Sequence, residues 1–139
     1  MTQTEALMAI ANRNGGLITP ALVLAKAKDP KSVLHGAFTW DDTEAAKKWR
    51  IHEAQVLIRR CRITVETSDE PVYAFIGVST DRTDDSANNP YRLASDVAKA
   101  PDLMAVAEAD AVRQLKGVKD RYSHIRKLNT VWTAIDSLS

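Results

Sequence analysis

The sequence has few of the residues that several kinds of structure and chemistry require. Cys61 is the single cysteine among 139 residues, which excludes an internal disulfide. The five glycines form no phosphate-binding loop, because Gly15-Gly16 precedes neither a Walker nor a dinucleotide pattern. No apolar run approaches the roughly 20 residues that span a bilayer, and no N-terminal stretch matches a signal peptide. We therefore expect a soluble protein of the cytoplasm.

Residues that carry catalysis or bind metals are scattered along the chain. The three histidines lie far apart, at His35, His52 and His124. Adjacent carboxylates such as Asp41-Asp42 are more typical of a helix cap than of a metal site, and no histidine is spaced to complete a coordination sphere. A fold can still gather distant residues, but no catalytic grouping is visible. We therefore expect no enzyme, no cofactor and no metal.

Net charge is only +1, but it is distributed unevenly. Residues 1–62 carry ten basic and six acidic side chains, residues 63–110 carry three basic and ten acidic, and residues 111–139 carry six basic and two acidic. This order is typical of a protein that contacts an anionic partner with part of its surface. It is equally typical of a chain whose own segments attract one another.

The stretch from Phe38 to Arg62 predicts the central helix, because it contains neither Gly nor Pro and Asp41 or Asp42 can cap its start. At about 100° per residue, its apolar residues share one broad face and its basic residues lie opposite. The apolar face comprises Ala46, Ile51, Ala54, Leu57, Ile58 and Cys61, with Trp49 and Val56 on a flank. The opposite side comprises Lys48, His52, Gln55, Arg59 and Arg62.

The predicted elements follow the order of a winged helix-turn-helix. Helices are expected at Thr4–Arg13 (capped by Thr4), Pro20–Lys28 and Thr43–Arg62, followed by a β-hairpin wing at Ile63–Ser79 with a loop of about four residues. In that arrangement the third helix enters the major groove of DNA and the wing touches the backbone.

We therefore predict a site for double-stranded DNA on the basic side of the central helix. Lys48, Arg59 and Arg62 would contact phosphates, while His52 and Gln55 would face bases. A long connector from Pro30 to Trp40 and the acidic residues of the wing (Glu66, Asp69 and Glu70) count against this prediction. The alternative is a basic face that is merely solvated.

The second half of the chain predicts a loop, a short strand and a long helix. Residues 81–90 are polar and acidic and indicate a mobile surface loop, and Tyr91–Leu93 can add a strand. From Pro101 onward, apolar residues recur at three- and four-residue steps, which predicts one amphipathic helix or two helices broken near Gly117. This segment can pack on its own domain, or it can form a homo-oligomer, since heptad-like spacing persists.

Two runs and one motif resemble a known group of proteins. The runs are GLITPALVLAKAKDP and LHGAFTWDDTEAAKKWRIHEAQVLIR, and the motif is Phe38-Thr39-Trp40-Asp41-Asp42 followed by Ala46 and Arg50. Together with YRLASDV and RYSHIRKL they resemble a family of small proteins encoded by bacteriophages and prophages. The resemblance implies a viral origin and carries no functional residues across. Small phage proteins of this kind often work on DNA, which favours a DNA-binding function by analogy only.

These observations predict an α+β protein with a winged-helix-like domain (1–80), an acidic loop and connector (81–100) and a C-terminal helical segment (101–139). The predicted function is that of a non-enzymatic, phage-encoded DNA-binding protein in the cytoplasm of a bacterial host, acting as a dimer or higher oligomer. The alternatives are an adaptor that binds a host protein through Asp81–Asp85 or the C-terminal helix, and a minor virion or assembly protein.

Overall fold

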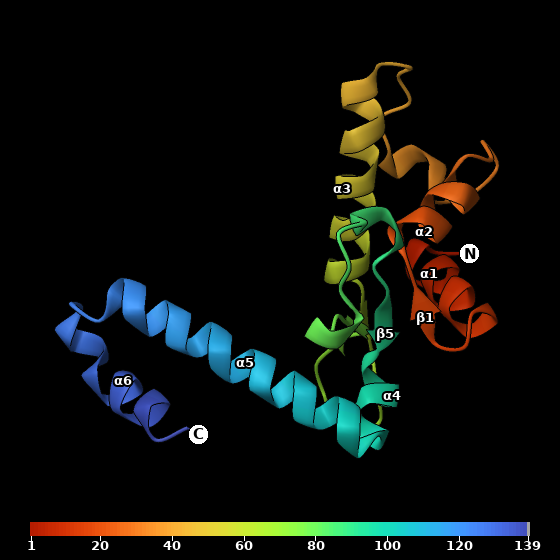
Figure 1. Ribbon diagram of the computed structural model, residues 1–139. Helices are drawn as coiled ribbons and strands as arrows, with labels where there is room; N and C mark the ends of the chain where they lie inside the picture. Colours follow the sequence, from red (N-terminus) through yellow and green to blue (C-terminus); the bar gives the residue numbers. More distant parts are fainter. Residues whose placement is uncertain (139) are drawn as a thin grey trace.

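The computed structural model describes residues 1–138 and confirms the α+β class. The helices are α1 (Gln3–Arg13), α2 (Pro20–Ala27), α3 (Glu44–Arg60), α4 (Ala94–Lys99), α5 (Pro101–Tyr122) and α6 (Asn129–Asp136). The strands are β1 (Leu17–Ile18), β2 (Arg62–Ile63), β3 (Val72–Tyr73), β4 (Phe75–Ile76) and β5 (Tyr91–Leu93). The short 3-10 helices are η1 (His35–Ala37), η2 (Ser79–Asp81), η3 (Ser86–Asn88) and η4 (Arg126–Leu128). Helices α1 to α3 and the strands form one body, from which α5 projects (Figure 1).

Threonine hydroxyls begin the first two helices. The Glu5 N–H donates to Thr2 Oγ1 over 3.1 Å at the start of α1, so the prediction that Thr4 caps this helix was wrong by two residues. The Leu22 N–H donates to Thr19 Oγ1 over 3.1 Å at the start of α2, as the Thr19-Pro20 pair predicts.

A threonine also begins α3, where a carboxylate was expected. Thr43 Oγ1 accepts the Ala46 N–H over 3.1 Å, which corrects the prediction that Asp41 or Asp42 is the cap. Asp41 Oδ1 accepts the Thr43 N–H over 3.0 Å, so this carboxylate shapes the turn before the helix instead. An aspartate and a threonine can both cap, and the backbone direction of the turn decides between them.

The Phe38-to-Asp42 motif folds as a clamp on the first turns of α3. Arg50 Nη1 donates to the backbone oxygens of Thr39 (3.0 Å) and Asp41 (2.8 Å). The Arg50 guanidinium lies 5.2 Å from the Trp40 ring, which also stacks on His35 at a centroid distance of 4.8 Å. The residues of this motif therefore have a structural role.

β5 is the middle strand of a three-stranded antiparallel sheet in the order β1-β5-β4. Leu17 pairs with Arg92, and Ile76 pairs with Arg92 from the other side. The segment predicted as a connector between residues 81 and 100 thus supplies the strand that joins the N-terminal part to the rest of the sheet. Leu17–Ile18 pairs as an edge strand, which the sequence alone does not show because two residues set no period.

The predicted wing divides between two sheets. β2 and β3 pair over two residues each, with Ile63 opposite Val72, and residues 64–71 form a loop longer than the expected four. β4 then leaves for the other sheet, and the Ala94 N–H bonds to the Ala74 oxygen over 2.8 Å at the junction. The prediction of one continuous hairpin from Ile63 to Ser79 was therefore wrong, because an alternating pattern indicates extended backbone without naming its partner.

The core lies between α1, α2, α3 and the sheet. On α3 and at its end, Ala54, Leu57, Ile58 and Cys61 are buried, which confirms most of the predicted apolar face. Burial raises the pKa of the Cys61 thiol, so this cysteine acts as a small hydrophobic side chain.

The C-terminal segment is a helical hairpin held to the body near its start. The sequence left open one long helix or two helices broken near Gly117. The segment is two helices, but α5 runs unbroken through Gly117 and the chain turns only after Tyr122, so the break lies further along the chain than that alternative placed it. A glycine inside a helix costs about 1 kcal/mol, too little to end a long helix by itself. Asp110 Oδ2 accepts the Ser79 N–H over 2.8 Å, which ties α5 to η2.

Candidate nucleic-acid interface

The residues predicted to bind DNA lie on the outer side of α3 and in the strand that follows. Lys48, His52 and Arg59 are exposed on the helix, Gln55 is half-buried, and Arg62 is exposed at the start of β2. Within residues 1–138 none of these cations forms a salt bridge with a carboxylate of the chain. Their charge is therefore available to an external anion.

A groove of about 940 Å³ lies where the end of α3 meets the sheet and the segment before β5. It is lined by Gln55, Val56, Arg59, Arg60, Tyr73, Phe75, Ile76, Gly77, Arg82, Asn89, Pro90, Tyr91, Ala94 and Gln114. The structure brings Gln55 and Arg59 into this groove, whereas Lys48, His52 and Arg62 lie outside its lining. The lining contains three arginines and no carboxylate, so the groove is cationic.

Two arginines at this end of α3 are oriented by tyrosines. Arg59 Nε donates to the Tyr91 hydroxyl over 3.0 Å, and its guanidinium carbon lies 5.9 Å from the ring centroid. Arg62 Nη2 donates to the Tyr73 hydroxyl over 2.7 Å, with a centroid distance of 4.5 Å. A neutral phenol positions the cation without neutralising it, and the other N–H donors of the guanidinium stay available.

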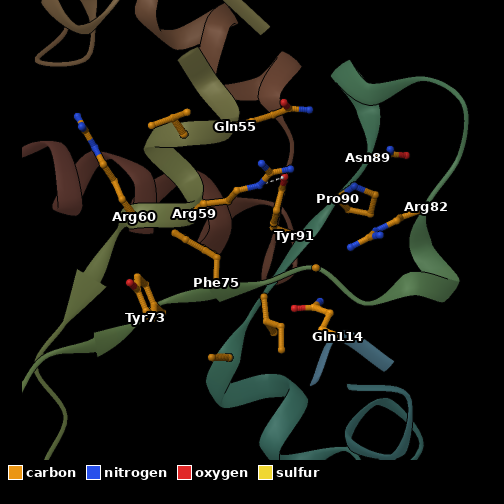
Figure 2. Close-up of a pocket in the computed structure, with 14 residues that line it drawn as sticks. Gln55, Arg59, Arg60, Tyr73, Phe75, Arg82, Asn89, Pro90, Tyr91 and Gln114 are labelled. Atoms are coloured by element: carbon orange, nitrogen blue, oxygen red, sulfur yellow. Dashed lines mark hydrogen bonds between the residues drawn. The ribbon is translucent and has the colours of Figure 1, made fainter. Parts of the chain in front are cut away.

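Figure 2 shows how the side chains share the groove. Arg59 lies across its middle toward Tyr91, Arg60 and Tyr73 lie on one side, and Arg82 lies on the other. In this view the Arg60 guanidinium points away from Arg59, so Arg59 and Arg82 are the arginines that face the middle of the groove, and they come from two different segments of the chain. Bidentate geometry makes arginine especially suited to phosphate.

Sequence reasoning missed Arg60, Arg82 and Tyr91. Arg60 lies off the basic stripe of α3 on a helical projection, and the Arg59-Arg60 pair was the only signal for it. Arg82 follows Asp81 in an acidic stretch, and the negative net charge of that stretch gave no reason to expect a cationic site there. Tyr91 enters the site through strand pairing with β1, a relationship that spacing along the chain does not reveal.

Two of the three carboxylates in the acidic segment beside the groove, residues 81–90, are used within the chain. Asp81 accepts two hydrogen bonds from Arg92, over 2.6 and 2.9 Å, and this partnership raises the pKa of the Arg92 guanidinium. Asp85 caps η3 through the Ala87 N–H over 3.2 Å. The segment predicted as a mobile acidic loop is thus folded by its own hydrogen bonds, and two of its carboxylates are already occupied.

An exposed aromatic pair continues the same side of α3 away from the groove. Trp49 is 54% exposed, and its ring lies 4.8 Å from that of His52. An indole of this exposure is unusual for a side chain with only a packing role. It offers a flat apolar surface next to the cationic stripe.

Comparison with protein-family models, with curated proteins and with solved structures finds no match for this chain. The resemblance to the phage and prophage family therefore stays a prediction from the sequence. Among residues 1–138, no three potential metal ligands gather into one cluster. No helix in that range has both the length and the apolar character needed to cross a membrane.

Proposed function

We propose that this protein is a non-enzymatic DNA-binding protein that contacts the phosphate backbone of a duplex through the groove formed by Arg59, Arg60 and Arg82. The outer side of α3, with Lys48 and His52, would continue the contact along the DNA. The phage or prophage origin and the bacterial cytoplasm belong to the same proposal, and they rest on the sequence resemblance alone.

The observation that carries the proposal is a concave site with three arginines and no lining carboxylate in a chain of net charge +1. A surface that served only solubility would mix both signs of charge. Here Asp81 is paired with Arg92 and Asp85 caps η3, while Arg59 is held by the phenol of Tyr91. Such an arrangement favours an external anion of repeating charge.

Binding to a labelled DNA duplex, followed by fluorescence anisotropy, tests the proposal. We expect Arg59→Ala/Arg60→Ala/Arg82→Ala to weaken binding roughly 10-fold or more and to flatten the dependence of affinity on salt, because fewer phosphates are neutralised and fewer counterions are released. The matched control is Lys26→Ala/Lys28→Ala/Lys31→Ala, which removes the same charge from α2 and the turn after it. Equal losses of affinity in both variants, or no binding by the wild type at low salt, would remove the groove as a DNA site.

A protein–protein adaptor is the alternative function. The exposed apolar residues of α5 and α6 favour it, whereas the Asp81–Asp85 route is weakened because Asp81 and Asp85 are used within the chain. Capture from nuclease-treated host lysate separates the two functions. A specific partner that survives nuclease treatment supports the adaptor, and one that disappears with the nucleic acid supports DNA binding.

A further inference from the structure

The C-terminal helical hairpin, formed by α5 and α6, leaves many large apolar side chains exposed, because two helices alone cannot bury them. Seven large hydrophobic side chains between positions 115 and 138 are at least 36% exposed, namely Leu115, Val118, Tyr122, Ile125, Leu128, Val131 and Leu138. Only Trp132 and Ile135 among the large hydrophobic side chains of this stretch are buried. Single exposed apolar residues are ordinary, but so many within one helical hairpin indicate an interaction surface.

The exposed residues of α5 form one stripe. Leu115, Val118 and Tyr122 follow one another at steps of three and four residues, so they lie on one face of the helix. α6 folds back along α5, where Trp132 Nε1 donates to the Ile125 oxygen over 3.2 Å and Lys119 pairs with Asp136. The hairpin projects from the body of the molecule, so its stripe is not covered by the rest of the described chain (Figure 1).

We propose that a second copy of this chain covers the stripe, with the two α5 helices antiparallel about a two-fold axis and the α6 helices completing a four-helix bundle. This inference does not depend on DNA binding. Two helical hairpins supply the four apolar faces that a closed bundle core needs, and a two-fold interface is the commonest way for identical chains to meet.

The charge pattern of α5 selects the antiparallel arrangement. Residues 101–111 carry three acidic and no basic side chains, whereas residues 112–122 carry four basic and one acidic. An antiparallel pair places each acidic half against the basic half of its partner, while a parallel pair places like charges together. The opposed helix dipoles favour the same arrangement.

Four of these charges are free to pair with a second copy. Asp102 and Glu108 in the first half, and Lys116 and Arg121 in the second, are exposed and form no salt bridge within residues 1–138. Asp110 and Lys119, in contrast, are already bound within the chain.

The molar mass in solution gives the first test, measured by light scattering during size-exclusion chromatography. We expect the wild type at twice the 15.3 kDa mass of the chain and Leu115→Glu/Val118→Glu at the single-chain mass. These side chains are 42% and 44% exposed, so the variant should keep the helical circular dichroism of the wild type. Val33→Glu, at a 39% exposed position outside the hairpin, is the control and should stay dimeric. A single-chain mass for the wild type up to roughly 1 mM protein overturns the proposal.

Charge exchange gives the second test, which is specific for orientation. Asp102→Lys/Glu108→Lys makes both halves of α5 basic, and Lys116→Glu/Arg121→Glu makes the second half acidic like the first. We expect each variant alone to be monomeric and an equal mixture of the two to form a heterodimer. A dimer that persists in both separate variants overturns the antiparallel pairing. If the measured mass exceeds that of the single chain only when a different protein is bound, the stripe is the binding site of that protein and the proposal is overturned.

Discussion

Arg59 Nε donates a hydrogen bond of 3.0 Å to the hydroxyl of Tyr91, a residue 32 positions further along the chain. Tyr91 is held in β5, opposite Ile18 of β1. The position of one cation in the groove is therefore set by a sheet contact that begins near the N-terminus. The hydrogen bond therefore links α3, the helix expected to bind DNA, to β5, the strand that pairs with both β1 and β4.

Replacing Tyr91 by Phe should weaken DNA binding without unfolding the protein. The substitution removes one exposed hydrogen bond, a contribution of about 0.5–1.5 kcal/mol, and leaves the ring beside the guanidinium in place. We expect Tm to fall by a few degrees, because the lost bond lies within the chain, and Kd measured by anisotropy to rise, because the Arg59 guanidinium is no longer held in place. Thr130→Ala, which removes a hydroxyl from an exposed position at the start of α6, is the control. Unchanged affinity in Tyr91→Phe would show that the phenol does not orient Arg59 for the DNA.

Replacing Thr43 by Ala should destabilise the start of α3. The Thr43 hydroxyl accepts the Ala46 N–H, and loss of an N-cap costs about 1 kcal/mol. We expect the free energy of unfolding in urea to fall by about that amount, whereas Thr67→Ala in the exposed 64–71 loop should change it by much less. If both variants lose equal stability, Thr43 is not the cap in solution.

Gly16 should be less replaceable than its neighbour Gly15. Both have positive φ, at +83° and +65°, so any side chain strains the backbone at either position. A Cβ on Gly16 would also collide with the Asp96 carboxylate, whereas one on Gly15 meets open space. We expect Gly16→Ala to lower Tm more than Gly15→Ala in a thermal melt. Equal shifts would mean that Asp96 moves away at no cost.

The tie between α5 and the body should weaken in acid. Hydrogen bonds from Ser79, and then the Arg113 guanidinium, lower the pKa of the Asp110 carboxyl below its ordinary range. The stabilising contribution of Asp110 is therefore fully present above the unfolded-state pKa of about 4 and is lost as pH falls through the lower folded-state pKa.

The variant Asp110→Asn isolates this contribution. We expect it to be less stable than the wild type at neutral pH, with the difference in free energy of unfolding narrowing as the pH drops below about 4. Urea denaturation at several pH values measures the difference. Thr67→Ala, a substitution of an exposed side chain that does not titrate, is the control, and its effect should not change with pH. A gap that stays constant with pH would mean that Asp110 does not titrate differently on folding.

The sequence determined the local features of this protein. The helical spacing of Ala54, Leu57, Ile58 and Cys61 specified the inner face of α3, and Thr19-Pro20 specified the start of α2, because both depend on contacts within a few residues. The outward position of Lys48, His52 and Arg59 followed from the same spacing. The function inferred from that surface stays a prediction.

Only the tertiary structure decided which extended segments pair and which side chains meet. β4 and β3 are separated by one residue, yet they belong to different sheets. Arg82 and Gln114 also line the groove, although they come from segments whose spacing of apolar and charged residues has no relation to that of α3. Strand pairing and groove formation depend on contacts between residues distant along the chain, and a periodic pattern specifies the face of an element without specifying its partner.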